Sequence, residues 1–360
     1  MSCSMNMLRI GPVSVRWKSR PLMICCLLLA VILLLAVFHI ATGTMSFSSS
    51  RVVSSLLGGS DNATADRIIQ RVRLPRLVTA LFVGASLGMA GSIFQSISRN
   101  ALGSPDVIGF TTGAATGAIA QIILLNAGPL ETALSAVASG MAAAVLVFVL
   151  AVKGRRTGGY RLILVGIGVG PSFRASTLYS VAGDLDRAAS AQLWLSGSLN
   201  TRSWAHAVPA MAGFVVTVPL ALYYAKSTNL LEMGDDAACQ LGIQPERTRL
   251  MMVLVAVTLT SVATASVGPI AFVALAAPQL ARRLTANSSF PLISGALMGA
   301  TLLVGADLLS QHVPFGIKMP IGLTTGLLGD FIFFGFLLAT KTRLVVLEKQ
   351  RKLAKKTNHY

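Results

Sequence analysis

Residues 22–41 constrain the fold of this chain more than any other stretch. The run reads LMICCLLLAVILLLAVFHIA, and His39 is its one acidic or basic side chain. About 20 helical residues at 1.5 Å each cross the roughly 30 Å hydrocarbon layer of a membrane. The run therefore predicts a membrane-spanning helix. A cleaved signal peptide is the alternative, because Arg16, Lys18 and Arg20 precede the run, but the apolar core of a signal peptide is usually only about 7–15 residues long.

Further apolar segments follow, so the sequence predicts an all-α bundle of ten membrane-spanning helices. The later spans are expected at 74–95, 107–125, 131–152, 161–182, 205–225, 249–267, 270–281, 290–310 and 321–340. Charged residues make up only 12% of the chain, whereas soluble domains carry about 25%. This difference excludes an ordinary soluble protein. We divide the chain into a basic N-terminus (1–21), a membrane domain (22–345) and a basic tail (346–360).

The net charge of +17 could indicate nucleic-acid binding, but the basic residues follow the predicted spans. If the N-terminus is cytoplasmic, most Lys and Arg residues lie at the cytoplasmic ends of the helices. Ten spans return the C-terminus to the same side, as the positive-inside bias requires. The sequence therefore predicts a multi-pass membrane protein with both termini in the cytoplasm.

Small residues recur at four-residue spacing inside the spans. The pairs are Gly84 with Gly88, Gly113 with Gly117, Gly166 with Gly170, and Gly295 with Gly299. Small residues let helix backbones approach closely in lipid. This spacing favours a tight bundle of several helices over a single membrane anchor.

Several functions are excluded or made less probable by what the sequence lacks. Gly166, Gly168 and Gly170 are followed by Pro171 inside a membrane span, which does not fit a dinucleotide-binding turn. No G-x-x-x-x-G-K-[ST] loop is present to hold nucleotide phosphates, so the chain alone is not predicted to hydrolyse ATP. The four cysteines, Cys3, Cys25, Cys26 and Cys239, have neither metal-ligand spacing nor a plausible disulfide pairing. We expect no cofactor and no metal site.

Charged side chains inside the spans are few. An ion-driven carrier would normally contain buried acidic or His groups as relays. Asp307 and Asp330 lie toward the ends of their segments, where solvation or helix capping is expected. Arg174 lies deeper in its segment, and it either extends to the outer headgroups or faces the path of an anionic substrate.

The longest cytoplasmic loop between spans contains a predicted amphipathic helix at 229–243. It begins with acidic residues, which suit a helix N-terminus, and it stops at Gly242. Its apolar side contains Leu231, Ala238 and Leu241. We expect this side to pack against a partner protein; a solvated loop helix is the alternative.

Four sequence blocks between about residues 70 and 340 resemble the ABC-importer permeases for iron siderophores, haem and vitamin B12. The blocks are Arg73-Leu74-Pro75-Arg76; Gly84 to Gln95 with Arg99 to Pro105; Trp194, Gly197-Ser198-Leu199 and Trp204; and Gly268-Pro269-Ile270-Ala271-Phe272 to Arg282-Arg283. Within this family, Gly103 to Phe110 and Leu231 to Asp236 are most similar to the ferric-enterobactin permeases. The resemblance implies import of a ferric catecholate siderophore, with another iron chelate, haem or a corrinoid as alternatives.

The resemblance also implies a multi-pass subunit of the bacterial inner membrane that is not itself an enzyme, together with partners and site residues. The partners are a homologous second permease, two ABC ATPase subunits and a periplasmic siderophore-binding protein. The cytoplasmic gate is assigned to Asn100, Leu102, Gly158, Gly159 and Tyr160, and binding-protein docking to Arg73, Arg76 and Lys318. Coupling to the ATPase is assigned to Leu231, Glu232, Gly234, Asp235, Asp236, Ala237, Ala238, Leu241 and Gly242.

Three residues depart from the usual family pattern. Ala101 replaces a proline and Gln279 replaces a histidine, while Lys318 stands where Glu or Gln is commoner. The resemblance also implies that the polar run at 95–115 is the cytoplasmic turn between the second and third spans. An ion-coupled secondary transporter and a membrane scaffold are the remaining alternatives from other classes of protein.

Overall fold

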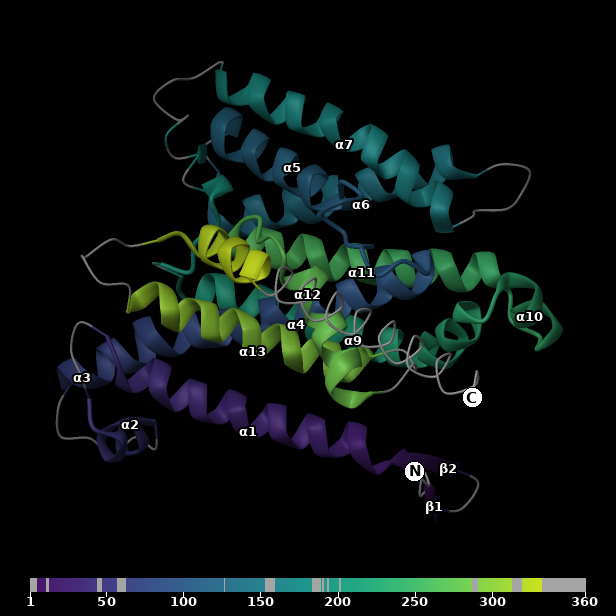
Figure 1. The fold of residues 1–360 in the computed structure, drawn as a ribbon. Helices are drawn as coiled ribbons and strands as arrows, with labels where there is room; N and C mark the ends of the chain where they lie inside the picture. The colour runs from purple at the N-terminus through teal and green to yellow at the C-terminus, as the bar shows by residue number, and fades with distance from the viewer. Residues whose placement is uncertain are drawn as a thin grey trace, which may run out of the picture.

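The computed structural model is a bundle of long helices with a small hairpin at its N-terminal end (Figure 1). It describes residues 5–10, 13–43, 47–56, 63–125, 127–152, 159–182, 189, 191–192, 194–200, 202–286, 291–312 and 319–331. The helices are α1 (Ser19–Ala41), α2 (Ser49–Leu56), α3 (Ala63–Ile68), the π-helix η1 (Ile69–Arg73), α4 (Leu74–Ser98), α5 (Phe110–Leu125), α6 (Pro129–Ala151), α7 (Gly159–Ala182), α9 (Trp204–Glu232), α10 (Asp235–Gln240), α11 (Pro245–Val267), α12 (Val273–Thr285) and α13 (Leu292–Gln311). Residues 321–331 are also helical.

Helix α4 is the centre of the bundle. It packs against α13, α11, α9 and α12. Most of its residues are buried, and few of them are charged. Helix α1 lies beyond α13 at one edge, and α7 lies beyond α5 and α6 at the opposite edge (Figure 1). We call the two ends of the bundle the α2 end and the α10 end, after the short helices that lie there.

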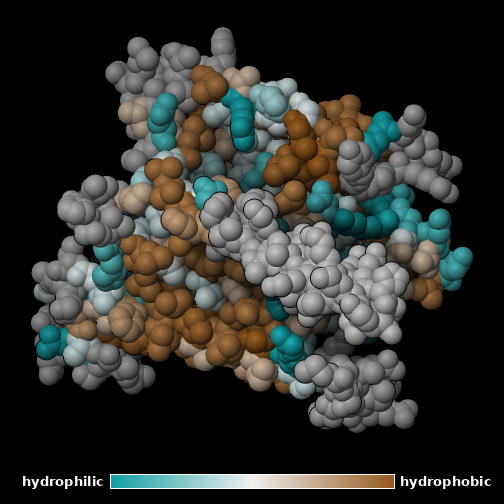
Figure 2. Space-filling view, viewed as in Figure 1, coloured by the Kyte–Doolittle hydropathy of each residue, from teal (hydrophilic) through white to brown (hydrophobic). Residues whose placement is uncertain are grey.

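Six of the described helical stretches are long and apolar enough to cross a membrane. They are Ser19–Ala41, Thr64–Ser98, Leu130–Ala151, Trp204–Glu232, Pro245–Val267 and Leu292–Gln311. Apolar side chains cover much of the surface over α1 and α13 (Figure 2). Every one of the ten expected segments overlaps helix in the described residues, but ten complete spans stay a prediction.

The glycine spacing correctly predicted close helix packing. A Cβ atom added to Gly84 would lie 2.5 Å from the Gly299 carbonyl oxygen, and one added to Gly88 would lie 2.2 Å from the Gly295 carbonyl oxygen. These distances leave no room for any side chain, so α4 and α13 meet backbone to backbone. Gly166 is similarly close to the backbone of Ile108.

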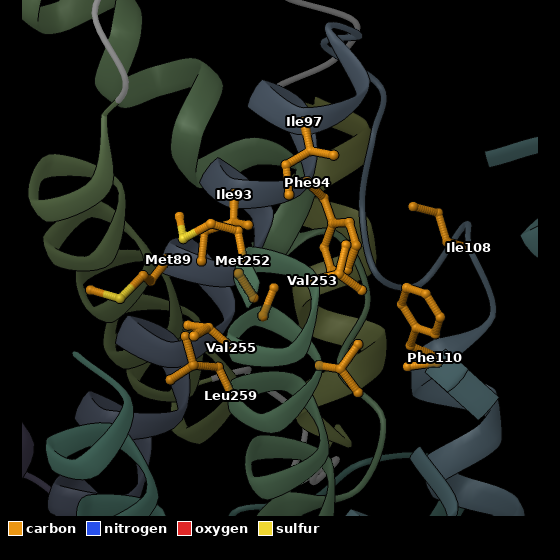
Figure 3. Close-up of a cluster of buried hydrophobic side chains, with 14 of the residues drawn as sticks. Met89, Ile93, Phe94, Ile97, Ile108, Phe110, Met252, Val253, Val255 and Leu259 are labelled. Carbon is orange, nitrogen blue, oxygen red and sulfur yellow. The ribbon is translucent and has the colours of Figure 1, made fainter. Parts of the chain in front are cut away.

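The main apolar core joins α4 to α11 and to the segment that precedes α5. Phe94 of α4 and Phe110 of α5 have ring centroids 5.4 Å apart. Met252 and Leu259 of α11 are completely buried in the same cluster (Figure 3). This core lies on the α10 side of the glycine contacts along α4 and fixes the end of α4 that carries the polar turn.

The N-terminal residues form an antiparallel hairpin that the all-α prediction did not include. Strand β1 (Met5–Ile10) pairs with β2 (Val13–Lys18), with Met5 opposite Lys18. Apolar and polar residues alternate in β2 but not throughout β1, where Met7 and Leu8 are adjacent, and the sequence between the strands, Gly11-Pro12, is a turn signal. The hairpin lies at the α10 end of α1 (Figure 1).

Candidate functional site

The polar run after α4 forms an ordered turn at the α10 end. Arg99 ends the helix in the left-handed region, with φ of 50°. The side-chain oxygen of Asn100 accepts a hydrogen bond from the Leu102 N–H at 2.9 Å. The Gly103 N–H donates to the Asn100 carbonyl at 3.0 Å. Asn is suited to this position because its side chain can satisfy nearby backbone groups. Asn100, a predicted gate residue, therefore shapes the turn that carries the exposed Leu102.

A pocket of about 430 Å³ opens beside this turn. Three helix ends and the turn itself contribute its walls. Its lining residues are Gln95, Arg99, Asn100, Ala101, Glu232, Gln279 and Arg282. The predicted gate residue Asn100 and the predicted coupling residue Glu232 thus face one cavity, although they are far apart in the sequence.

Glu232, the last residue of α9, ties three helices together. Its Oε1 accepts hydrogen bonds from the Ser96 hydroxyl at 2.5 Å and from the Arg282 guanidinium at 2.7 Å. The same Arg282 nitrogen lies 3.0 Å from the Ser96 oxygen. Charge-assisted hydrogen bonds of this kind are about twice as strong as neutral ones. The ends of α4, α9 and α12 are therefore held to one another.

Asp235, the first residue of α10, bridges two arginines. Its carboxylate accepts from Arg99 and, through both oxygens at 3.1 Å, from Arg249 of α11. Arg99 also donates to the Leu231 carbonyl at 3.1 Å. The Arg249 side chain is only 2% exposed and pairs with Glu246 as well. The turn after α4, the start of α10 and α11 thus share one network of charges.

Two of the residues that depart from the family pattern meet at the turn. The Gln279 side-chain amide donates to the Ala101 carbonyl at 2.8 Å. Gln95 makes a second link from α4 to α12 by donating to the Leu275 carbonyl at 3.0 Å. Helix α12 therefore holds both the turn and the end of α4.

Asp106 lies between this turn and α5 and is partly buried. The Thr111 hydroxyl donates to its Oδ1 at 2.6 Å. Burial raises the pKa of Asp106 from 3.8 to about 6, and the Thr111 hydrogen bond offsets part of this rise. The packing of the turn against α5 thus reduces the access of water to this carboxyl group.

The expected single helix at 229–243 is two helices in the structure, the end of α9 and the short α10. Helix α9 continues to Glu232, and Gly234 interrupts the path with φ of 124° before the short α10. Leu231 and Ala238, which we expected to pack against a partner protein, are buried within this chain. The apolar residues left exposed are Met233 and Leu241, at 70% and 60%.

The remaining predicted coupling residues surround these positions. Gly234 and Gly242 both have positive φ, at 124° and 78°. At both positions an added Cβ atom would have no neighbouring atom within 4 Å. Asp236 is exposed, and Ala237 is half-buried. Glycine is favoured at both turns because other residues rarely adopt such angles.

The arginines of the predicted docking motif lie at the α2 end. Arg73 is buried; it donates to the Ile40 carbonyl at 2.5 Å and its guanidinium carbon lies 4.8 Å from the centre of the Phe47 ring. Arg76 forms a bidentate pair with Asp307, with nitrogen–oxygen distances of 2.6 and 2.8 Å. Both arginines thus make internal contacts, and Arg76 keeps the larger exposed fraction.

Asp307 corrects another expectation. We expected a solvated or helix-capping residue, but its side chain is 1% exposed. His39 of α1 lies 2.6 Å from its Oδ2. The cost of burying the carboxylate is offset by these polar partners. Asp330, the other acidic candidate, is exposed.

The other predicted residues are less fully described. Arg174 is on the exposed surface of α7. Gly159 and Tyr160 begin α7, whereas Gly158 and Lys318 lie outside the described residues. The described part of the chain contains no group of three His, Cys, Asp or Glu residues that could hold a metal ion.

Sequence reasoning missed the partners that complete both polar networks. Arg282 was identified only as part of a family block, and Arg249, Ser96 and His39 were not singled out as site residues. Charged residues near the ends of apolar helices were the available signal. Their pairing depends on helix contacts that join residues as much as 268 positions apart.

Comparison with known proteins identifies the family. Residues 28–340 match the model of the FecCD transport family. The chain is 40% identical to the Ferric enterobactin transport system permease protein FepG of Escherichia coli K12 over 91% of this chain and 99% of that protein. It is 33% identical to the Fe(3+)-citrate import system permease protein YfmE of Bacillus subtilis over 91% of this chain and 98% of that protein.

A solved structure gives the same result. It is described as an inward-facing conformation of a metal-chelate type ABC transporter, is 27% identical in sequence, and superposes with a TM-score of 0.77 over 89% of this chain and 99% of that one. Relatives of this kind are non-catalytic membrane subunits, which agrees with the absence of a phosphate-binding loop from the sequence. The chain belongs to the FecCD transport family of membrane permeases.

Proposed function

We propose that this chain is a permease subunit of an ABC importer and moves a ferric siderophore from the periplasm to the cytoplasm. Ferric enterobactin or a similar catecholate is the proposed substrate, because the identity with FepG extends over nearly the whole of both chains. Two relatives named for ferric citrate, at 33% and 35% identity, support an iron chelate more generally. ATP is hydrolysed on partner subunits.

The observation that carries this proposal is the position of Asp235 between Arg99 and Arg249. A permease that cannot bind ATP must receive work through contact with its ATPase. Displacement of α10 would pull on Arg99, which ends α4 and begins the turn with Asn100 and Leu102. The network thus gives a physical route from a surface helix to the proposed gate.

We assign ATPase contact to the exposed part of the segment around α10. Met233, Asp236 and Leu241 supply an accessible surface, while Asp235 and Glu232 connect that surface to the bundle. Ala238 supports α10 from inside the chain. This division keeps the proposed coupling segment and changes which of its residues touch the partner.

In this proposal the α10 end faces the cytoplasm and the α2 end faces the periplasm. The clustered Arg99, Arg249 and Arg282 at the α10 end suit the positive-inside bias. The N-terminal hairpin also lies at that end (Figure 1). Ten spans in the inner membrane, with both termini cytoplasmic, complete the topology that we propose.

The proposed gate contains Asn100 and Leu102, with Gly158, Gly159 and Tyr160 as its second part. The polar pocket beside Asn100 gives this end an opening large enough for ordered water or a ligand group. Arg174, exposed on a membrane helix, is proposed to attract an anionic ferric chelate along the path. Without such a role, placing a charged side chain on the surface of a membrane helix has a high free-energy cost.

The proposed partners are a homologous second permease, two ATPase subunits and a periplasmic binding protein. Arg73, Arg76 and Lys318 form the proposed docking set for the binding protein. Burial makes Arg73 a support for this surface and leaves Arg76 as the residue available for direct contact. A corrinoid is an alternative substrate, since a relative named for cobalamin import is 33% identical over 75% of this chain.

Uptake by the complete importer tests the proposed substrate. The chain is co-expressed with its partner subunits in cells that lack their own catecholate permeases, and accumulation of radioactive iron is measured for ferric enterobactin, ferric citrate and a ferric hydroxamate. We expect accumulation with ferric enterobactin and loss of it when ATP is depleted. Transport of citrate or hydroxamate without the catecholate contradicts the substrate, and uptake that depends on ion gradients alone contradicts the importer.

Asp235→Asn tests the network in the same cells. The substitution leaves Arg249, which is 2% exposed, with less compensation, and the loss of such a partner costs about 1–3 kcal/mol. We expect the importer to assemble and hydrolyse ATP with little iron uptake. Asp330→Asn removes an exposed carboxylate and is the matched control. Normal uptake by the Asp235 variant would show that this network does not transmit work.

A further inference from the structure

The carboxylate of Asp307 is the centre of a polar cluster that joins three helices at the α2 end. Its Oδ1 accepts from Arg76 Nη2 at 2.6 Å. Its Oδ2 accepts from Arg76 Nε at 2.8 Å, from His39 Nε2 at 2.6 Å and from Gln311 Nε2 at 3.1 Å. The carboxylate can only accept, so His39 carries its proton on Nε2 in this contact. Helices α1, α4 and α13 each contribute to the cluster.

The cluster fixes one side chain in particular. A bidentate pair sets the plane of a guanidinium as well as its distance. Here the pair uses Nε and Nη2 of Arg76 and leaves Nη1 outside it. His39 and Gln311 hold the carboxylate from other directions, so that Asp307 cannot rotate without losing several hydrogen bonds.

Only the arginine of this pair reaches the surface. The side chain of Asp307 and that of His39 are each 1% exposed, whereas that of Arg76 is 19% exposed. A buried salt bridge is weak evidence for stability, because apolar residues of similar size often pack as well. The arrangement is better explained if the protein needs the exposed guanidinium in a fixed orientation.

We propose that Asp307 is a positioning residue that presents Arg76 to a carboxylate on the periplasmic binding protein. The inference rests on the proposed docking role of Arg76 and extends it to three internal residues: Asp307 sets the guanidinium, and His39 and Gln311 set Asp307. An arginine held in its bound orientation loses less side-chain entropy when the partner arrives. Nη1 is the nitrogen that the internal pair leaves for that partner.

Charge and positioning predict opposite effects of removing the Asp307 carboxylate. If only charge matters, Asp307→Asn removes a negative group near the docking surface and strengthens binding of an acidic partner. If positioning matters, Arg76 becomes mobile and binding weakens. The side-chain ordering cost corresponds to about a 3- to 10-fold weaker affinity.

A double-mutant cycle in the full importer, reconstituted in lipid nanodiscs, separates these possibilities. Affinity for the loaded binding protein is measured for the wild type, Asp307→Asn, Arg76→Ala and the double variant. We expect Asp307→Asn to weaken binding with Arg76 present and to have no further effect with Ala at position 76. Ser310→Ala, which removes a buried hydroxyl bonded to the Asp307 carbonyl, is the control for local disturbance of α13.

Each outcome has a distinct meaning. Unchanged affinity in Arg76→Ala overturns the docking role itself. A loss in Arg76→Ala with unchanged or tighter binding in Asp307→Asn overturns positioning alone. Equal losses from Asp307→Asn in both backgrounds indicate a structural role and also overturn it. Should Asp307→Asn fail to assemble, Gln311→Ala keeps the Arg76 pair and removes one support, and the same dependence on Arg76 is required of it.

Discussion

Alanine in place of Gly88 tests how strongly the bundle depends on backbone contact between α4 and α13. The new Cβ would lie 2.2 Å from the Gly295 carbonyl oxygen and 3.1 Å from the Gly299 Cα. Ordinary van der Waals contact begins at 3.4 Å. Backbone atoms cannot turn away as a side chain can, so the two helices must separate by about 1 Å.

The expected cost follows from two opposing terms. Overpacking of a close contact costs typically about 1–3 kcal/mol, while replacing glycine in a helix contributes about 0.5–1 kcal/mol of stabilisation. An approach of 2.2 Å to a backbone oxygen places the overpacking cost in the upper part of its range, so the net loss is about 1–2 kcal/mol. Gly305 on α13 has no neighbour within 4 Å of an added Cβ, so Gly305→Ala keeps only the favourable term and is the matched control.

The assay is the fraction of purified permease complex that remains monodisperse after heating, followed by size-exclusion chromatography. A change of 1 kcal/mol shifts a midpoint by roughly 2–4 °C in proteins of moderate size. We expect Gly88→Ala to lower the midpoint by several degrees and Gly305→Ala to keep or raise it. Equal midpoints for the two variants would refute the conclusion that α4 and α13 meet through their backbones.

Three further predictions concern the α10 end. The pKa of Asp106 is raised from 3.8 to about 6, so ionisation of this carboxyl group destabilises the fold above pH 6, and the destabilisation disappears as the pH falls toward 3.8. Asp106→Asn should therefore raise the free energy of unfolding by about 1–3 kcal/mol at pH 8. An equal increase at pH 4 would contradict this cause. Gln279→Leu removes the hydrogen bond to the Ala101 carbonyl and should raise leakage of a small fluorescent solute into ATP-free vesicles. Unchanged leakage would show that this hydrogen bond does not help to keep the gate closed. Leu241→Asp places a charge on the exposed side of α10 and should abolish binding of the ATPase to a normally folded permease; normal ATPase binding would exclude this surface.

The helical part of the fold could be predicted from sequence because lipid leaves the backbone few choices. Every buried N–H and C=O must be satisfied within the segment, so an apolar run long enough to span the membrane predicts a helix. The glycine pairs extended the prediction to packing, since Gly84 and Gly88 have few functions in lipid other than close approach. The hairpin of β1 and β2 was missed because a strand of six residues gives a weaker signal than a long apolar run.

The polar networks could be predicted only in part. The motif containing Arg76 was identified, but no local pattern indicates that its partner is Asp307, which lies 231 positions away. The apolar side of residues 229–243 was expected to pack against a partner protein. Amphipathicity cannot tell whether that contact comes from another protein or from the same chain, and for Leu231 and Ala238 it comes from the same chain.

The helical path from α3 through η1 to α4 has a mechanical consequence. Its 35 residues from Thr64 to Ser98 measure about 52 Å at 1.5 Å per residue, well beyond the roughly 30 Å hydrocarbon layer. Gly84 and Gly88 contact α13 about two thirds of the way along, and we expect any tilt of this path, together with the core around its end, to turn about that contact. A rod that tilts there is an unequal lever, whose arm toward the α2 end is about twice as long as the other. A movement at the α2 end would reach Arg99 at about half its amplitude and about twice its force.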